Sequence, residues 1–184
     1  FTNKVLIFGG EILQVLSIEA RQSITNMVVE AGATCGMMLV DAVTVNYLWP
    51  LLQKKYSIQE NALEDLGKQW NCDEGCEYDE IIDFDITGLK PRATVGYSPG
   101  DSVEVATLEK TPVNQVYIGS CTNGRIEDFR IAAYIFRNDE RPLAEGVRCI
   151  INPSTPDVMN KMVEEGLFAT FMEKGCCITN PNCG

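Results

Sequence analysis

Residues 116–125, VYIGSCTNGR, contain the end of a short apolar strand, a turn and a single cysteine, Cys121. The first three side chains of this stretch are β-branched or aromatic, which suits a strand. Thr122 and Asn123 are turn or capping residues, and an apolar pattern with helical spacing begins at Ile126. The stretch therefore predicts a strand that ends just before the cysteine and a helix that begins a few residues after it.

The same order of strand, turn and helix continues to the end of the chain. Strands are expected at 115–119, 147–151 and 176–179, with helices between them at about 126–137 and 156–173. Strands that alternate with helices form a parallel sheet with helical crossovers, so the predicted fold class is α/β. The helix residues expected to face the core are Ile126, Phe129, Ala133, Phe136, Met159, Met162, Val163 and Phe171.

The beginning of the chain has a similar pattern. A strand is expected at 4–8, a helix from Ser17, as its N-cap, to Ala31, and a buried strand at 34–40. Gly32 suits the end of that helix, because glycine readily adopts a left-handed conformation. The residues expected on the apolar face of the helix are Ile24, Met27, Val28 and Ala31.

Two helices and a strand are expected in the next part of the chain. A helix capped by Asp41 should end near Pro50, because proline removes a hydrogen-bond donor from a helix interior, and a second helix should run from Ser57 to Trp70. The segment 79–86, DEIIDFDI, alternates between apolar and acidic residues, which indicates a half-buried strand. The acidic residues assigned to its solvent face, rather than to a metal site or an acid–base pair, are Asp83 and Asp85.

The composition changes over residues 88–112, where Gly, Pro, Ser, Thr and charged residues predominate. Such a change is typical of a linker. We therefore expect two consecutive, partial domains, residues 1–95 and residues 114–184, joined by a linker at 96–113.

The composition also argues against several kinds of partner and site. The 184 residues include 15 basic and 26 acidic ones, a net charge of −11, so neither nucleic acid nor a membrane surface is an expected partner. The chain contains no histidine, the commonest acid–base group and metal ligand. Because it lacks an initiator methionine and ends at Gly184 within an expected loop, we expect it to be part of a larger protein.

Eight cysteines are many for a chain without a secretion signal, and most are interpreted as small buried apolar residues. Cys72 and Cys76 form a C-x3-C pair, but no second pair completes the four ligands of a structural zinc site. We therefore interpret these two as loop thiols. The cysteines expected in the core are Cys35, Cys149, Cys176 and Cys177.

Cys121 and Cys183 differ from the others, because each follows a strand of the expected parallel sheet. The carboxyl ends of parallel strands lie at one edge, where open α/β sheets bind ligands, so both thiols should face the same crevice. A helix N-terminus after Cys121 would favour its thiolate. Thiolates are the ligands that soft metals and iron–sulfur clusters require.

Four stretches resemble the cluster-binding and neighbouring segments of the aconitase superfamily: IGSCTNGR at 118–125, TNPNCG at 179–184, SITNMVVEAGA at 23–33 and CEYDEIIDFDITGLKP at 76–91. Their order and spacing also match, so the resemblance covers nearly the whole chain. Within the superfamily, the chain is most similar to the large subunits of the 3-isopropylmalate dehydratase and homoaconitase branches. The resemblance implies iron–sulfur domains of this type, with a three-layer αβα architecture and mainly parallel sheets.

The resemblance further implies a hydro-lyase that acts on a small hydroxy-di- or tricarboxylate by dehydration and rehydration, with a [4Fe–4S] cluster held by three cysteines. Cys121 and Cys183 match two of the ligands. Asn26 matches an amide near the cluster, and Glu30 matches an acid near the iron-bound oxygen. The residues expected to donate hydrogen bonds around the first ligand are Ser120 and Asn123.

Other parts of the family's site are missing from this chain. The third cysteine would follow Gly184 by two residues, and the family's histidines and substrate-binding arginines are absent. In isopropylmalate dehydratases the serine base belongs to a small swivel-domain subunit. We therefore expect a middle fragment of a cytoplasmic large subunit, whose partners are the remaining domains, the small subunit and the substrate. Alone, it is expected neither to hold an intact cluster nor to turn over substrate.

The expected reaction is the conversion of 2-isopropylmalate to 3-isopropylmalate in leucine biosynthesis. Aconitase, homoaconitase and a dimethylmalate-type dehydratase are alternatives with the same chemistry, because no residue here identifies the side chain of the substrate. The net charge of −11 disfavours an iron-regulated RNA-binding relative. The lack of clustered C-x2-C runs disfavours an electron-transfer iron–sulfur protein.

Overall fold

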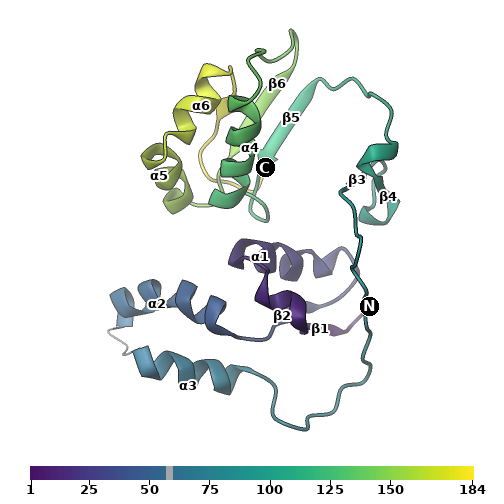
Figure 1. Ribbon diagram of the computed structural model, residues 1–184, viewed down its shortest axis with the longest axis vertical. Helices are drawn as coiled ribbons and strands as arrows, with labels where there is room; N and C mark the ends of the chain where they lie inside the picture. Colours follow the sequence, from purple (N-terminus) through teal and green to yellow (C-terminus); the bar gives the residue numbers. More distant parts are fainter. Residues whose placement is uncertain (57–59) are drawn as a thin grey trace. The chain divides into compact units, whose positions relative to one another are not determined.

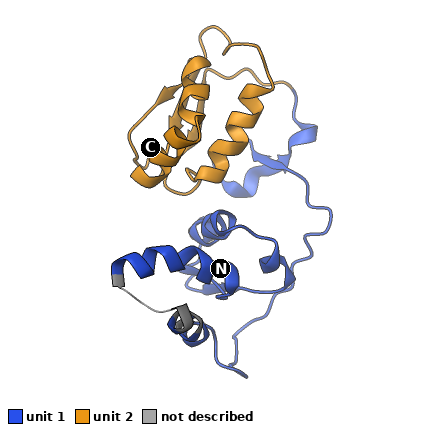
Figure 2. Cartoon of the chain, turned by 60° about the vertical axis from the view of Figure 1, so that its left-hand side comes forward, with its two compact units in different colours: residues 1–109 blue, residues 110–184 orange. Residues whose placement is uncertain are grey.

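The chain divides into two units, residues 1–109 and residues 110–184, called here the N-terminal and the C-terminal unit (Figure 2). The computed structural model describes residues 1–56 and 60–184. Within those described ranges, no helix is both long enough and apolar enough to cross a membrane.

The C-terminal unit is built on a parallel sheet of three strands in the order β5-β6-β7. Strands β5 and β6 lie side by side in Figure 1. The register pairs Gly119, the last residue of β5, with Asn152, the last residue of β6. The carboxyl ends of the strands therefore lie at one edge of the sheet. The predicted α/β fold with a parallel sheet is confirmed. The strands are β5 (Gln115–Gly119), β6 (Arg148–Asn152) and β7 (Cys177–Ile178).

Three helices accompany this sheet, although two were expected. The first, α4 (Ile126–Arg137), has the predicted bounds. The helix expected at 156–173 is divided into α5 (Pro156–Glu164) and α6 (Leu167–Glu173). Between them Gly166 has a φ of 68°, a left-handed conformation that ends the first helix and lets the chain change direction.

Aromatic side chains of α4 and α6 form the centre of the core. The ring of Phe171 contacts those of Phe129 and Phe136 edge to face, with centroids 6.3 and 5.8 Å apart. Val163, expected in the core, is 59% exposed because it lies in the last turn of α5, beside the break. The buried apolar residues are Ile126, Phe129, Ala132, Ala133, Cys149, Ile151, Met162, Leu167, Phe171 and Cys176.

The N-terminal unit begins with a short parallel pair of strands, β1 (Val5–Phe8) and β2 (Cys35–Met38). A 3₁₀ turn at Glu11–Gln14 and helix α1 (Ile18–Asn26) connect them. Ser17 caps the helix as predicted, because its Oγ accepts a hydrogen bond from the backbone of the first turn.

Helix α1 is shorter than predicted, because the chain tightens into a 3₁₀ turn at Met27–Val29. Val28 is buried, whereas Met27 is 46% exposed and Ala31 is also exposed. The prediction that 34–40 is a buried strand is wrong, since alternate residues of β2 are exposed. A sheet of two strands leaves too little covering structure to bury both faces.

Helix α2 (Ala42–Tyr56) begins as predicted, because Oδ1 of Asp41 accepts hydrogen bonds from the backbone of the first turn. It continues through Pro50, so the expected end at that residue is wrong. Proline lacks a single N–H group, and the residues after it can resume the helical hydrogen bonds. Helix α3 (Glu60–Trp70) follows, and the predicted start at Ser57 lies outside the described residues.

Residues 79–86 do not form the predicted strand. Phe84 is 72% exposed, and Ile82 and Ile86 are 44% and 47% exposed. Apolar alternation produces a strand only where a neighbouring strand and a covering layer are available. Among the described residues, no strand pairs with this segment.

The segment expected to be a linker contains part of a small antiparallel hairpin of β3 (Arg92–Thr94) and β4 (Ser102–Glu104). Ser98 caps the 3₁₀ turn Pro99–Asp101 between them, and another 3₁₀ turn, Val105–Thr107, follows. The Gly, Pro and Ser residues that indicated a linker therefore include the turn of a hairpin.

Candidate functional site

The loops after β5 and β7 bring two cysteines together at the carboxyl edge of the sheet. The Sγ atoms of Cys121 and Cys183 lie 3.4 Å apart, although the two residues are separated by 62 positions. Both cysteines are exposed. The parallel arrangement of the strands creates this proximity, because it directs both loops to the same edge.

Ser120 connects the two loops directly. Its Oγ donates a hydrogen bond of 2.8 Å to the carbonyl oxygen of Cys183 and lies 3.8 Å from the Sγ of Cys121. Its φ of 101° lies in a region that residues other than glycine rarely adopt. Such strained positions cluster at functional sites, where the surrounding structure holds them.

The two thiols share hydrogen bonds unequally. The pKa of Cys121 is lowered, mainly by a hydrogen bond from Cys183 and then by hydrogen bonds from Ser120 and Thr122. The pKa of Cys183 is raised, because its hydrogen bond to Cys121 and the charge on that thiolate both favour the protonated form. Cys121 is therefore the first of the two to become a thiolate. The expected cause was a helix N-terminus, but α4 begins only at Ile126.

The turn between Cys121 and α4 packs closely against the end of β6. Gly124 lies in this turn, and a Cβ atom there would be 2.8 Å from the carbonyl oxygen of Asn152. The backbone N of Ser154 donates a hydrogen bond of 2.9 Å to the carbonyl oxygen of Gly124. Arg125 contacts the start of the turn, because its Nη2 donates to the carbonyl oxygen of Cys121 at 3.2 Å.

Two buried polar atoms near this turn have no hydrogen-bond partner within the described part of the chain, the Nε of Arg125 and the Oγ of Ser154. Burying a polar group without a partner is costly, so such atoms point to a missing neighbour. Two adjacent thiols, one with a lowered pKa, are also a suitable donor set for a thiophilic metal group. The chemistry of these thiols therefore suits an iron–sulfur cluster, whose binding would replace the hydrogen bond between them.

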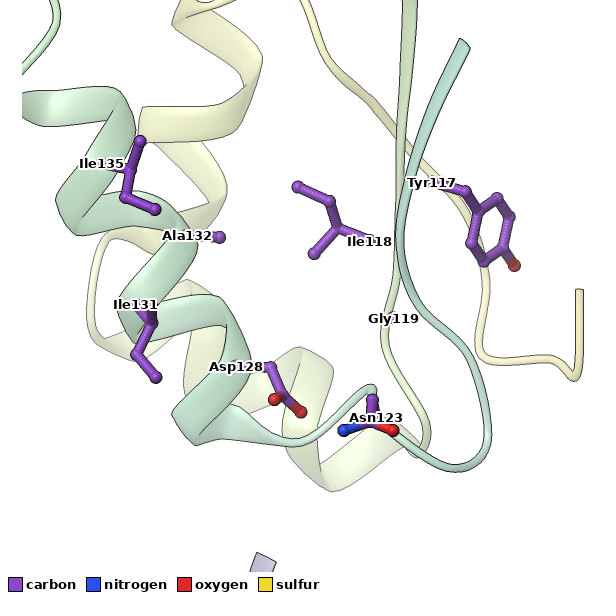
Figure 3. A pocket seen from close by; sticks show the side chains of 8 residues that line it. All are labelled: Tyr117, Ile118, Gly119, Asn123, Asp128, Ile131, Ala132 and Ile135. Atoms are coloured by element: carbon purple, nitrogen blue, oxygen red, sulfur yellow. The ribbon is translucent and has the colours of Figure 1, made fainter. Parts of the chain in front are cut away.

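A hollow of about 370 Å³ lies between β5 and α4, next to the cysteine turn (Figure 3). Ile118 points from the strand towards the helix, and Asn123 lies at the end of the hollow. Most of the lining is apolar, and Asp128 would repel a carboxylate. This hollow is therefore unsuited to an anionic substrate.

The other expected site residues belong to the N-terminal unit. Asn26 is the last residue of α1, and Glu30 directly follows the 3₁₀ turn at Met27–Val29. Both side chains are exposed. Within the C-terminal unit, the structure brings together Cys121, Cys183 and Ser120.

The remaining cysteines match the expectations only in part. Cys149 and Cys176 are buried as expected, whereas the same expectation for Cys35 and Cys177 is wrong, because both are exposed. Alternation in short strands points every second side chain outwards. Across the described ranges, no group of three or more His, Cys, Asp or Glu residues is arranged to hold a metal ion.

The C-x3-C pair lies beside a tyrosine. The hydroxyl of Tyr78 donates hydrogen bonds to the sulfurs of Cys72 and Cys76, and these bonds raise the pKa of the hydroxyl. All three side chains are exposed. The interpretation of the pair as loop thiols agrees with this position.

Asn152, the last residue of β6, has no feature in the sequence that predicts a role at the site. It is fully buried, and its side chain contacts the loop that carries Cys183. An asparagine that precedes proline after a strand is ordinarily interpreted as a turn residue. Only its burial distinguishes it from other turn residues.

Comparison with known proteins points to one family. The sequence matches the Aconitase family (aconitate hydratase) over residues 1–112 and 104–184. It is 44% identical over 183 residues to the 3-isopropylmalate dehydratase large subunit of Geotalea uraniireducens, covering 100% of this chain and 42% of that protein. The proteins of the same name from Geobacter sulfurreducens and Desulfosudis oleivorans are 44% and 45% identical with the same coverage. The chain thus spans about two fifths of the length of these relatives.

Proposed function

The chain belongs to the aconitase family, and from this membership we propose that it is part of the large subunit of an iron–sulfur hydro-lyase. Relatives with 44% and 45% identity are named 3-isopropylmalate dehydratase large subunits. We accordingly propose 2-isopropylmalate and 3-isopropylmalate as the pair that it interconverts, in leucine biosynthesis and in the cytoplasm. A small subunit and the remaining domains of the large subunit would be its partners.

The contact between Cys121 and Cys183 carries this proposal. We propose these residues as two ligands of a [4Fe–4S] cluster, because the loops after β5 and β7 bring both thiols to the ligand-binding edge of one parallel sheet. Further ligands would come from a part of the protein outside this chain. When bound, the cluster supplies a Lewis acid, which is needed because hydroxide is a poor leaving group.

The residues around the cysteines would orient the thiols and set their pKa, and they would not bind the substrate. The hydroxyl of Ser120 lies within hydrogen-bonding distance of both cysteines, and such contacts orient and tune metal ligands. Asn123, in the turn after Cys121, would act in the same way. Because the pKa of Cys121 is lowered, this residue is ready to bind as a thiolate.

Asn26 and Glu30 would serve the substrate. We propose that the Asn26 amide hydrogen-bonds near the cluster and that the Glu30 carboxyl group acts as an acid beside the substrate hydroxyl. Both side chains are exposed, so they are accessible to groups outside their own unit.

The domain assignment also remains a proposal. Residues 1–95 would belong to the second domain of the large subunit and residues 114–184 to the third, with a linker at 96–113. The division into two units after residue 109 supports a boundary in this region.

A chimera tests the proposed reaction. In the Geobacter sulfurreducens large subunit, the aligned segment is replaced by this chain, and the product is purified with its small subunit. We expect the chimera to isomerise 2-isopropylmalate. Cys121→Ser or Cys183→Ser should lower that activity at least about a hundredfold, because each removes a proposed ligand. Cys177→Ser, at another exposed thiol, is the matched control and should leave activity unchanged.

Two results would contradict the proposal. A folded chimera that binds the small subunit but cannot isomerise 2-isopropylmalate would rule out the assigned substrate. Activity that survives both cysteine substitutions would rule out the assigned ligands.

A further inference from the structure

Asn152 contacts both of the loops that carry the facing thiols. Its side chain is 0% exposed, at the point where the central strand β6 ends between β5 and β7. A buried carboxamide needs partners for its N–H groups and for its oxygen. Asn152 finds both in the loop after β7.

The carboxamide binds that loop at two places. Nδ2 of Asn152 donates a hydrogen bond of 2.8 Å to the carbonyl oxygen of Asn182, the residue before Cys183. Oδ1 of Asn152 accepts a hydrogen bond of 2.6 Å from Oγ1 of Thr179. Thr179 directly follows β7, so the carboxamide holds both the start of the loop and the position next to the cysteine.

The main chain of the same residue binds the other loop. The carbonyl oxygen of Asn152 accepts a hydrogen bond of 3.0 Å from the backbone N of Ser120, the residue before Cys121. One residue therefore holds the position before each cysteine, through its backbone on one side and its side chain on the other. The loops also meet directly, because Ser120 Oγ donates to the carbonyl oxygen of Cys183.

We propose that Asn152 is a positioning residue that holds the Cys183 loop against the Cys121 loop, so that the two thiols stay neighbours at this edge of the sheet. The purpose of this proximity rests on the proposed function, since two ligands of one cluster must come from loops that lie side by side. The proximity itself is a property of the chain and can be measured with no cluster present.

A carboxamide is the side chain that satisfies both contacts. The substitution Asn152→Asp keeps the size and the acceptor for Thr179, but it places a carboxylate oxygen against the carbonyl oxygen of Asn182. It therefore removes the contact next to Cys183 while the shape of the site is unchanged. Release of the loop, rather than a cavity, is the expected consequence.

The experiment measures the proximity of the thiols by cross-linking. The 184-residue chain is prepared with its other exposed cysteines replaced by serine. The remaining thiols are then Cys121 and Cys183, which are exposed, and two that are buried. Dibromobimane is then added, because it becomes fluorescent only after both of its arms have reacted with thiols. The replaced residues are Cys35, Cys72, Cys76 and Cys177.

Asn152→Asp should slow the formation of the cross-link about tenfold, since a buried hydrogen bond contributes on that scale. The rate at which a reagent with one arm modifies each thiol should change far less, because both are already exposed. If Asn152 only stabilised the fold, the substitution would lower the melting temperature but would not slow cross-linking more than modification by the one-armed reagent. Asn138→Asp is the matched control, since it removes a similar 2.8 Å bond from Nδ2 to a carbonyl oxygen at the far end of α4.

A second variant keeps the test decisive if Asn152→Asp does not fold. Thr179→Val removes the hydrogen bond that Oγ1 of Thr179 donates to Asn152, and it leaves the sequence of β6 unchanged. It should slow cross-linking about threefold. A folded variant of either kind that cross-links at the original rate would overturn the inference. Failure of the chimera to isomerise 2-isopropylmalate would instead overturn the proposed function and leave this result standing.

Discussion

Gly119 is the last residue of β5, paired with Asn152 of β6 and directly before the cysteine turn. Its φ is 120°, and a Cβ atom there would overlap the carbonyl oxygen of Asn152. Gly146 also has a positive φ, 79°, but a Cβ atom at that position would meet nothing within 4 Å. Alanine substitutions at these two glycines therefore distinguish the cost of backbone strain alone from the cost of strain together with steric overlap.

Gly119→Ala should destabilise the C-terminal unit by about 2–4 kcal/mol, because strain and overlap add. Gly146→Ala should cost only about 1–2 kcal/mol, the strain alone. Urea unfolding, followed by circular dichroism, measures both values. Equal costs for the two substitutions would show that β5 and β6 can separate at Gly119 without penalty.

The buried thiol Cys176 makes stability depend on pH. Its pKa is raised to about 12, mainly by burial and to a smaller extent by the nearby Cys149. An unfolded cysteine titrates near about 8.5. The contribution of Cys176 to stability is therefore fully present below about pH 8.5 and is lost as the pH rises towards the folded value, because only the unfolded state then releases the proton.

Cys176→Val should reduce this alkaline loss of stability, because it removes one of the titrating thiols. Cys149, whose pKa burial also raises, would preserve a smaller loss. Cys177→Val, at the exposed neighbour, is the control and should retain the full pH dependence. The measurement is the urea midpoint of the C-terminal unit between neutral and alkaline pH. Parallel curves for the two variants would contradict the assignment to Cys176.

At the scale of elements, a buried arginine joins three parts of the N-terminal unit. Arg21, in α1, is 3% exposed, and its guanidinium group donates to both carboxylate oxygens of Asp41 at 2.7 and 2.8 Å. It also donates to the carbonyl oxygens of Leu13 and Leu16, which lie in and after the 3₁₀ turn that follows β1. The same guanidinium group holds the pKa of Asp41 below its ordinary value.

Arg21→Met should destabilise the N-terminal unit by about 3 kcal/mol, because it removes the donor to the buried carbonyl oxygen of Leu13 and the partner of the Asp41 carboxylate. Lys68→Met is the control, since Lys68 is exposed and its ion pair with Asp65 is 3.7 Å long, and it should change stability by less than about 0.5 kcal/mol. Thermal unfolding of the two variants measures the difference. A loss for Arg21→Met no larger than that of the control would exclude the assigned role.

Some elements could be predicted from local sequence, and others could not. The bounds of α4 were predicted correctly, because its apolar residues follow helical spacing and pack into one core. The strand predicted at 79–86 does not form, although the alternation of apolar and acidic residues there is equally regular. A helix satisfies its own backbone hydrogen bonds, whereas a strand needs a neighbour that its own sequence does not contain.

At the scale of the whole molecule, the chain carries two proposed cluster ligands and covers 42% of its relatives. We expect that anaerobic incubation of this chain with iron and sulfide yields no stable, stoichiometric cluster, because two cysteines alone would not hold four irons. Visible absorbance together with iron and sulfide analysis after gel filtration measures the outcome. The Cys121→Ser variant is the baseline for non-specific iron. A stable cluster of four irons on the unmodified chain would contradict this expectation.

The sequence by itself determined the alternation of strand and helix in the C-terminal unit and the position of Cys121 and Cys183 after two of its strands. These features depend on local periodicity and on residues that stop a strand, which can be read along the chain. It also determined the family resemblance, because the motifs are contiguous.

Only the tertiary structure decided that Cys183 hydrogen-bonds Cys121, that Asn152 holds both loops, and that Cys35 and Cys177 are exposed while Cys149 and Cys176 are not. The physical reason is the same in each case. Burial and hydrogen bonding at these positions depend on residues that are distant in sequence, and they arise only when the parallel strands align.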